Sequence, residues 1–341
     1  MFHDVMRMAD RRFLLNAFLP SAAFLLALTG LVAQRTAPAS TDLWRRIAAA
    51  HLTAAALVAA LVVAFVVAAF VSTQTGVIIR WYEGDWRGPV GRFAAATGRR
   101  FHLRRLSRLD PRNGADYDRI YHDYPLPGRV HDVQPTRIGN ILRNAETYPA
   151  DRYGMDTAIV WPRLHPLLPE PVAAAIAAAK ADMEFQLVVA TLAATFSGVG
   201  TVILAVTDAP SSATLACLWG SGLLADISYR GALGAARRYG GQVKVAVDLY
   251  RLTLLQQLGI PNDEMRSSAQ QRAAYTSLAQ WWYRNVPLAA QAEPATDDID
   301  ENGEPQQPST ASGRRPLAPS LHAVAATGAV TASVVILLLA R

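Results

Sequence analysis

Long apolar runs are the feature that most restricts how this chain can fold. Four stretches, residues 13–33, 47–71, 185–206 and 317–340, are nearly free of charge. A helix needs about 20 apolar residues to cross the roughly 30 Å of hydrocarbon in a bilayer. Charged residues make up only 18% of the chain, against about 25% in soluble domains. The pattern predicts a mainly α-helical protein that crosses a membrane several times.

A fifth apolar run, residues 209–227, is shorter and contains several serines and glycines. It follows the 185–206 run after a tight turn at 207–210. A lone incomplete span leaves backbone polar groups unsatisfied in lipid, so we expect these two runs to pair as a helical hairpin. This brings the expected number of spans to about five, and leaves open whether 209–227 crosses the bilayer completely.

Lysine and arginine mark the side of the membrane on which each connection lies. Residues 72–184 carry sixteen of them and residues 228–316 carry ten, whereas the 207–210 turn carries none. Positive residues stay on the cytoplasmic side. The counts predict that both long connections lie in the cytoplasm, with the N-terminus inside and the C-terminus outside. Arginine greatly outnumbers lysine and alanine is abundant, a bias typical of a high-GC bacterial genome, so the expected location is a bacterial inner membrane. Because Arg35, Arg45 and Arg46 fit an outside loop poorly, a cleaved signal peptide remains an alternative for the first span.

The sequence accordingly divides into six parts. These are an N-terminal two-helix membrane hairpin (1–72), a cytoplasmic arginine-rich domain (73–184), a second membrane hairpin (185–227), a cytoplasmic helical hairpin (228–288), a disordered linker (289–316) and a C-terminal transmembrane helix (317–341). The linker is rich in Pro, Asp, Glu and Ser and poor in apolar residues, which is typical of disorder.

In the cytoplasmic helical hairpin, a series of small and apolar residues beginning at Leu233, Ala236 and Gly240 alternates spacings of three and four. That spacing predicts a coiled-coil-like contact. Asn262 is expected to cap the helix that follows.

Three aromatic residues, Trp81, Tyr82 and Trp86, directly follow the second span. Tryptophan and tyrosine gather at membrane interfaces, so we interpret them as interface anchors. A helix is expected over 90–96, followed by an arginine-rich stretch that flanks the membrane and by a loop over 110–132. Nucleic-acid binding is not expected, because no recognition module is present. The acidic residues of the loop do not fit a calcium-loop pattern, so we expect neither a metal nor a cofactor.

Four polar residues, Arg137, Asn140, Arg152 and Arg163, stand out after this loop. They belong to short segments that read PTRIGN, RYGMD and WPRL, and the first of these begins a helix expected to run to about residue 147. The four side chains either hold the domain together through hydrogen bonds or form a site that binds an anion or a partner.

These three segments resemble motifs in a group of uncharacterised actinobacterial integral membrane proteins. The resemblance covers residues 73–285. It implies a bacterial membrane protein, and it transfers no functional residue to this chain.

Three functions remain compatible with the sequence. The first is a non-catalytic membrane scaffold or sensor whose cytoplasmic domain docks a protein partner. The second is an oligomeric channel or pore, and the third is a membrane-associated enzyme that acts on a lipid or an anionic substrate. The sequence contains no HExxH, GxSxG or Walker A motif, each of which would point to a definite chemistry. We therefore assign no catalytic residue, and expect as partners the lipid bilayer and either a second protein or further copies of the chain.

Overall fold

A computed structural model of the chain describes residues 13–36, 54–260 and 267–287. These residues form helices joined by short connections, without any strand among them. In chain order the helices are η1 (Leu14–Phe18), α2 (Leu19–Thr36), α4 (Ala54–Glu83), α5 (Gly88–Leu106), α6 (Gly114–Asp123), η2 (Pro127–Asp132), α7 (Arg137–Tyr153), α8 (Thr157–Leu164), η3 (His165–Leu167), α9 (Glu170–Val206), α10 (Ser211–Gln257) and α11 (Ser268–Arg284).

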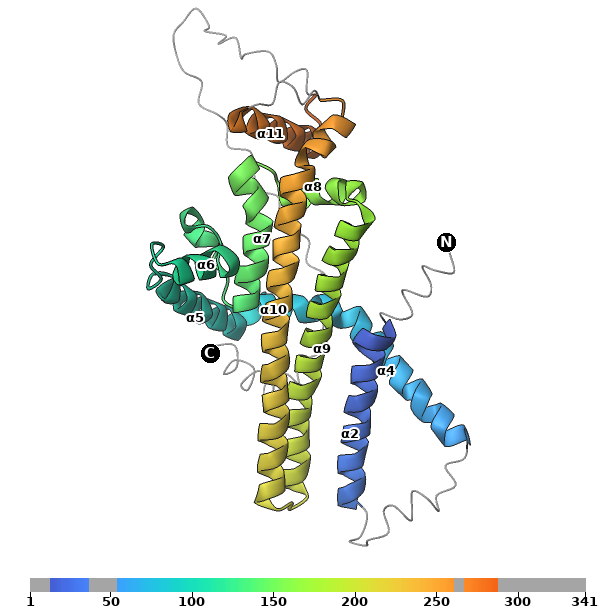
Figure 1. Cartoon of the computed structure of the whole chain (residues 1–341). Helices are drawn as coiled ribbons and strands as arrows, with labels where there is room; N and C mark the ends of the chain where they lie inside the picture. Colours follow the sequence, from blue (N-terminus) through green and yellow to red (C-terminus); the bar gives the residue numbers. More distant parts are fainter. Residues whose placement is uncertain (1–12, 37–53, 261–266, 288–341) are drawn as a thin grey trace, which may run out of the picture.

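Helices α9 and α10 form the central hairpin of the molecule (Figure 1). They contain 37 and 47 residues, which corresponds to about 55 Å and about 70 Å of helix. Their contact is lined largely by small buried side chains such as Ala190, Ala194, Ala232 and Ala236. Small residues let two helix backbones approach closely, which suits helices that pack in lipid.

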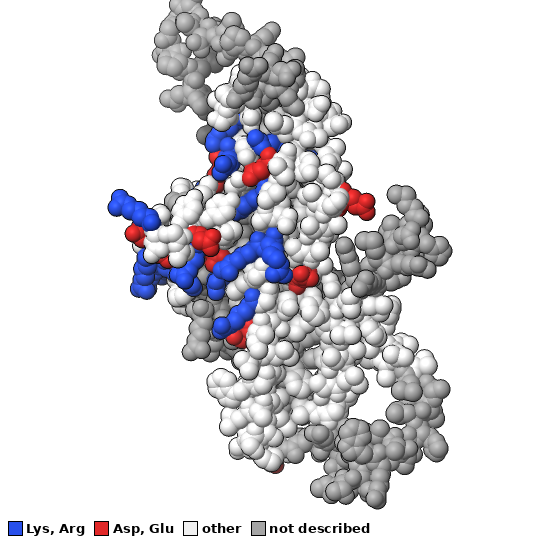
Figure 2. Space-filling view, viewed as in Figure 1, with Lys and Arg blue, Asp and Glu red and all other residues white. Residues whose placement is uncertain are grey.

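Most of the charged residues that the structure describes lie in one half of the molecule. Residues 13–33, 54–79 and 185–225 contain a single charged residue, Asp208, and it lies in the turn between α9 and α10. Figure 2 shows the visible Lys, Arg, Asp and Glu gathered over the upper half and a largely uncharged lower half. Large apolar side chains are exposed in that lower half, including Phe65, Phe70 and Trp219. Such a surface is suited to lipid.

Within the described residues, three helices are long and apolar enough to cross a membrane, and they carry the spans Leu14–Val32, Val58–Glu83 and Glu170–Val206. These features indicate a membrane protein. The 209–227 run forms the first part of α10, which is not among the three. The expected linker and C-terminal span, 289–316 and 317–341, lie outside the described residues.

The head, defined as helices α5 to α8, α11 and the adjoining parts of α9 and α10, is more helical than expected. The prediction of a loop over residues 110–132 was wrong, because this stretch contains α6 and η2. Asn113 accepts a hydrogen bond from the backbone nitrogen of Ala115 and so caps α6. The helix expected over 90–96 extends over Gly88–Leu106.

Two other helix ends also bear on the expectations. Helix α7 continues past residue 147 to Tyr153, with Pro149 inside it. Ser267 caps α11 in a capping box with Gln270, and the expected cap, Asn262, lies outside the described residues. Such a box satisfies two backbone donors at once.

Two apolar clusters hold the head to the hairpin. The first joins Tyr82 of α4 and Ile138 of α7 to Leu187 of α9 and Ala232 of α10. The second lies farther along the hairpin and contains Leu164 of α8 and Tyr275 of α11. Six residues of the expected series on α10, Leu233, Ala236, Gly240, Val243, Val247 and Leu254, are buried, and the seventh, Tyr250, is half-buried. The coiled-coil-like contact stays a prediction.

Candidate functional site

The head meets the membrane helices at two adjacent cavities of about 740 Å³ and 920 Å³. Both are lined by Ile79 of α4, Trp161 of α8, Lys180 of α9 and Tyr239 of α10. We call the two cavities together the junction groove. Each volume lies in the range of about 300–1,000 Å³ that is typical of binding clefts.

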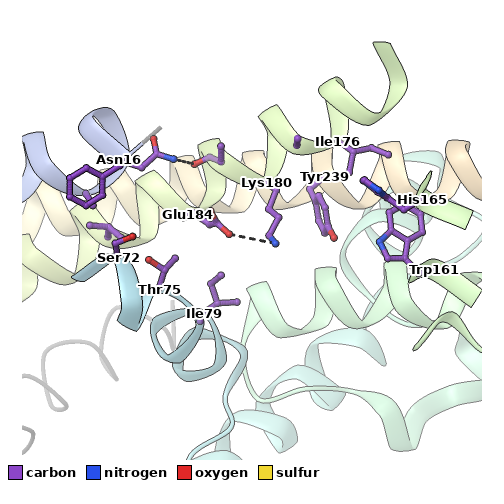
Figure 3. A pocket seen from close by; sticks show the side chains of 16 residues that line it. Asn16, Ser72, Thr75, Ile79, Trp161, His165, Ile176, Lys180, Glu184 and Tyr239 are labelled. Carbon is purple, nitrogen blue, oxygen red and sulfur yellow. Dashed lines mark hydrogen bonds and ion pairs between the residues drawn. The ribbon is translucent and has the colours of Figure 1, made fainter. Parts of the chain in front are cut away.

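The membrane-side cavity combines apolar walls with an ion pair (Figure 3). The Lys180 Nζ lies 3.8 Å from the Glu184 Oε1, one turn farther along α9. The hydroxyl groups of Ser72 and Thr75 on α4 line the same cavity. Trp161 lies at its far end in edge-to-face contact with His165, with ring centroids 5.7 Å apart.

The head-side cavity has the same mixed character. Leu142, Met183 and Val243 supply apolar surface. Arg143 and Glu146 supply charge, with 3.1 Å between the Arg143 Nη1 and the Glu146 Oε2. Side chains three residues apart on a helix are neighbours, so this pair is local to α7.

The charges of the groove differ in how firmly they are held. The Lys180 side chain is 55% exposed, and only Glu184 pairs with it among the described residues. Arg143 is held on its other side by Asp132, at 2.8 Å. Burial would raise the pKa of Asp132, but hydrogen bonds from Arg143 and Arg129 lower it below its ordinary value. The Lys180–Glu184 pair is therefore the part of the groove that an incoming charged group can most readily rearrange.

Asn140 is buried inside the turn before α7. Its Nδ2 donates to the carbonyl oxygens of Gln134 and Thr136 at 2.9 and 2.7 Å, and its Oδ1 accepts from the Gln134 nitrogen at 2.8 Å. All of these partners belong to the turn itself. The side chain therefore holds the PTRIGN segment in shape.

Arg137, Arg152 and Arg163 lie apart from one another. Arg137 is 3.4 Å from the Asp123 carboxylate, and Arg163 donates to the Ile159 carbonyl at 2.7 Å while its guanidinium lies 4.3 Å from the Trp282 ring. Arg152 lies over the Tyr148 ring at the other end of α7 from Arg137, and fifteen residues of helix separate the two by about 22 Å. The structure does not bring these three and Asn140 into one site, and none of the four lines the junction groove.

The three expected interface aromatics do not share one environment. Tyr82 is only 2% exposed and stacks on Tyr229, with ring centroids 5.8 Å apart. A ring buried to this extent contacts protein and not lipid headgroups. Trp81 and Trp86 are partly exposed, and the Trp86 Nε1 donates to the Trp81 carbonyl at 2.7 Å, so interface anchoring stays a prediction for these two.

Sequence reasoning missed a two-bonded ion pair in the head. Arg237 on α10 donates to both oxygens of Asp123 on α6, at 2.6 Å each. The two residues are 114 positions apart, so no local spacing could have shown the pair. The Asp226–Arg230 pair, at 2.8 Å, differs in that helical spacing of four residues is enough to predict it.

Lys244 is a second feature that the sequence did not reveal. It is 6% exposed, and its Nζ lies over the rings of Tyr121 and Tyr148 at 4.4 and 5.3 Å. Burial lowers the pKa of Lys244 to about 8. Asp248, one turn farther along α10, accepts hydrogen bonds from the hydroxyls of Tyr148 and Tyr153.

Comparisons of this chain with protein families, with curated proteins and with solved structures gave no match. The resemblance carried by the PTRIGN, RYGMD and WPRL segments stays a prediction.

Proposed function

We propose that this protein is a membrane scaffold or sensor whose cytoplasmic head docks a protein partner in the junction groove. The observation that carries the proposal is the composition of the groove walls. Membrane helices and head elements line it together, through Ile79 on α4, Trp161 on α8 and Lys180 on α9. A partner bound there contacts both halves of the molecule at once.

The chemistry of the groove favours an amphipathic helix as the docked segment. Apolar side chains from Ile79, Leu142 and Ile176 lie beside the Lys180–Glu184 pair. A helix with one apolar face and a flanking charge matches both kinds of surface, which is how amphipathic helices commonly bind grooves. The position of the groove at the charge boundary fits a partner that is itself associated with the membrane.

The continuity of α9 and α10 supports a signalling or positioning role. Each helix runs unbroken from the uncharged half into the head. A rigid connection of this kind can transmit a change in groove occupancy to the spans, because packed helices shift between discrete arrangements and do not deform continuously.

A non-catalytic role is supported by the way the polar side chains of the head are engaged. Asp123 is bound by two arginines, and Asp248 accepts from two tyrosine hydroxyls. Carboxylates bound in this way stabilise the head and are poorly placed to act as bases on a substrate.

The topology forms part of the same proposal. We infer five spans, with the first part of α10 crossing beside α9, and a head in the bacterial cytoplasm. The excess of Lys and Arg in residues 72–184 and 228–316 supports this orientation. An alkaline phosphatase fusion at Asp132 is expected to be inactive, and periplasmic activity there would reverse the orientation.

Site-specific photocrosslinking in native membranes tests the docking site. A photoreactive residue at Ala150 or Ala177, which line the two cavities, should capture one defined protein. The same residue at exposed Ala273 on α11 should not capture it. Equal capture at all three positions would contradict the proposed groove.

A charge reversal with a matched control sharpens this test. Lys180→Glu removes the groove ion pair and should abolish capture. The control is Asp182→Lys, because Asp182 lies on α9 like Lys180 but does not line the groove. This change breaks the exposed pair that Asp182 forms with Arg238 of α10, at 3.3 Å, and should leave capture intact. Loss of capture in both variants would indicate a general disturbance of α9, and loss in neither would count against the groove.

A further inference from the structure

Helix α5 presents bulky apolar side chains that the protein itself does not cover. Val90 and Phe93 are 77% and 75% exposed, and Phe101 is 43% exposed. At 100° per residue these three side chains fall within one 80° sector of the helix. Thr97 lies in the same sector and is also exposed. We call this sector the α5 stripe.

The opposite side of α5 contacts the head at a few points, which set the direction of the stripe. Buried His102 bonds to the hydroxyl of Tyr124 at 3.0 Å, and Arg99 donates to the His131 carbonyl at 2.7 Å. Gly98 lies so close to Pro135 that a Cβ there would clash with the Pro135 carbonyl oxygen. Because these contacts prevent α5 from turning over, the stripe points away from the head.

The chain brings α5 to the edge of the membrane-spanning part. The span Val58–Glu83 ends only five residues before α5 begins. The connection is a tight turn, in which Gly84 has a positive φ of 95° and the Asp85 nitrogen donates to the Arg80 carbonyl at 3.0 Å. In Figure 1, α5 lies across the axis of the α9–α10 hairpin, on the side of α6 nearer the α9–α10 turn. The stripe therefore lies near the boundary between the charged and uncharged halves.

The charge of α5 is entirely positive. Its sequence contains five arginines and no acidic residue. Within the described part of the chain, Arg92, Arg100, Arg104 and Arg105 take part in no ion pair. At 100° per residue, Arg100 lies about 20° outside the stripe and Arg104 falls within its sector, about two and three turns farther along the helix than Phe93. Apolar side chains beside unpaired arginines are the composition of helices that lie in the plane of an anionic membrane surface.

We propose that α5 is an in-plane membrane helix that binds anionic phospholipid in the leaflet on the side of the head. Val90, Phe93 and Phe101 enter the boundary between headgroups and acyl chains. Arg100 and Arg104 bind the phosphates. The contacts of α5 with Tyr124, His131 and Pro135 then link the height and tilt of the head to this helix.

Depth measurement by spin labelling tests the apolar part of the proposal. The full chain, carrying Cys217→Ser and one new cysteine, is placed in nanodiscs that contain phosphatidylglycerol. A label at Phe93→Cys should collide more with oxygen than with a water-soluble nickel reagent. A control label at Ala273→Cys on α11 should show the reverse. A Phe93→Cys label that behaves like the control would overturn the proposal, and a label shielded from both reagents would mean that protein, and not lipid, covers the stripe.

Counting the bound phosphatidylglycerol molecules tests whether the arginines of α5 bind anionic lipid. Each arginine near an anionic surface contributes about 1 kcal/mol, or about fivefold in affinity, so Arg100→Gln with Arg104→Gln should weaken phosphatidylglycerol binding about 25-fold in native mass spectrometry. Arg119→Gln with Arg238→Gln removes two exposed arginines elsewhere on the head and should change it less than twofold. Equal loss in both double variants would show that bulk charge, and not α5, binds the lipid.

Discussion

The Asp123–Arg237 pair gives the sharpest test of how the head is held together. Asp123 is 7% exposed and receives two hydrogen bonds from Arg237 and one longer contact from Arg137. Its carboxylate links α6 to the central hairpin, as does the contact of Lys244 with Tyr121. The change Asp123→Asn keeps the shape of the side chain and removes its charge.

The size of the effect follows from burial. Removing one partner of a buried ion pair costs about 3–5 kcal/mol, because the other charge is left uncompensated. Arg237 is 40% exposed and can regain water, so we expect the lower end, ~3 kcal/mol of unfolding free energy. At about 2–4 °C per kcal/mol, this corresponds to a fall in Tm of about 6–12 °C.

The assay is the thermal loss of a monodisperse species, measured on the full chain in detergent. The matched control is Asp118→Asn on the same helix, where the carboxylate is 75% exposed and lies 3.4 Å from His122. An exposed pair is worth about 0–1 kcal/mol, so this variant should move Tm by no more than about 3 °C. Equal shifts for the two variants would refute the reasoning. A double-mutant cycle with Arg237→Gln should return a coupling of about 2 kcal/mol.

Three further predictions concern the packing and the buried bases of the head. Gly139→Ala should lower Tm by several degrees, because its Cβ would collide with the Glu83 carbonyl oxygen, whereas Gly241→Ala, with nothing within 4 Å, should raise Tm slightly through better helix propensity; equal shifts would contradict this. Lys244 loses its proton near pH 8 when folded and near pH 10.5 when unfolded, so stability should rise between these values, and Lys244→Met should flatten that rise in unfolding curves. Burial lowers the pKa of His102 to about 4, so stability should fall as pH drops from about 6.5 to 4, and His102→Asn should reduce this dependence.

The long apolar runs could be predicted from the sequence because they depend only on local composition. Spans at Leu14–Val32, Val58–Glu83 and Glu170–Val206 match runs seen in the sequence, since lipid selects for apolar side chains regardless of what they pack against. The sequence also predicts that α9 continues from the head into its span, because no proline follows Pro171 within the helix. The Asp226–Arg230 and Arg143–Glu146 pairs followed from helical spacing alone.

The candidate sites could not be located from the sequence in the same way. The sequence singled out Arg137, Arg152 and Arg163 for their motifs. Arg137 and Arg163 contact Asp123 and Trp282, which only folding brings near, whereas Arg152 lies over Tyr148 one turn back on the same helix. The expected loop before α7 is helical, because Asn113 caps α6 and buried Ile120 packs its inner face. Local polarity suggested a loop at a place where tertiary burial favoured a helix.

The sequence by itself determined the apolar half, the long hairpin and the excess of positive charge outside it, because hydropathy and charge count are additive properties of the chain. Only the tertiary structure decided which charges are neutralised inside the head and which remain available. Asp123 meets Arg237 across 114 residues, and the junction groove joins Ile79, Trp161 and Lys180 from three different helices. Such contacts depend on how helices cross and pack, which no local sequence pattern determines.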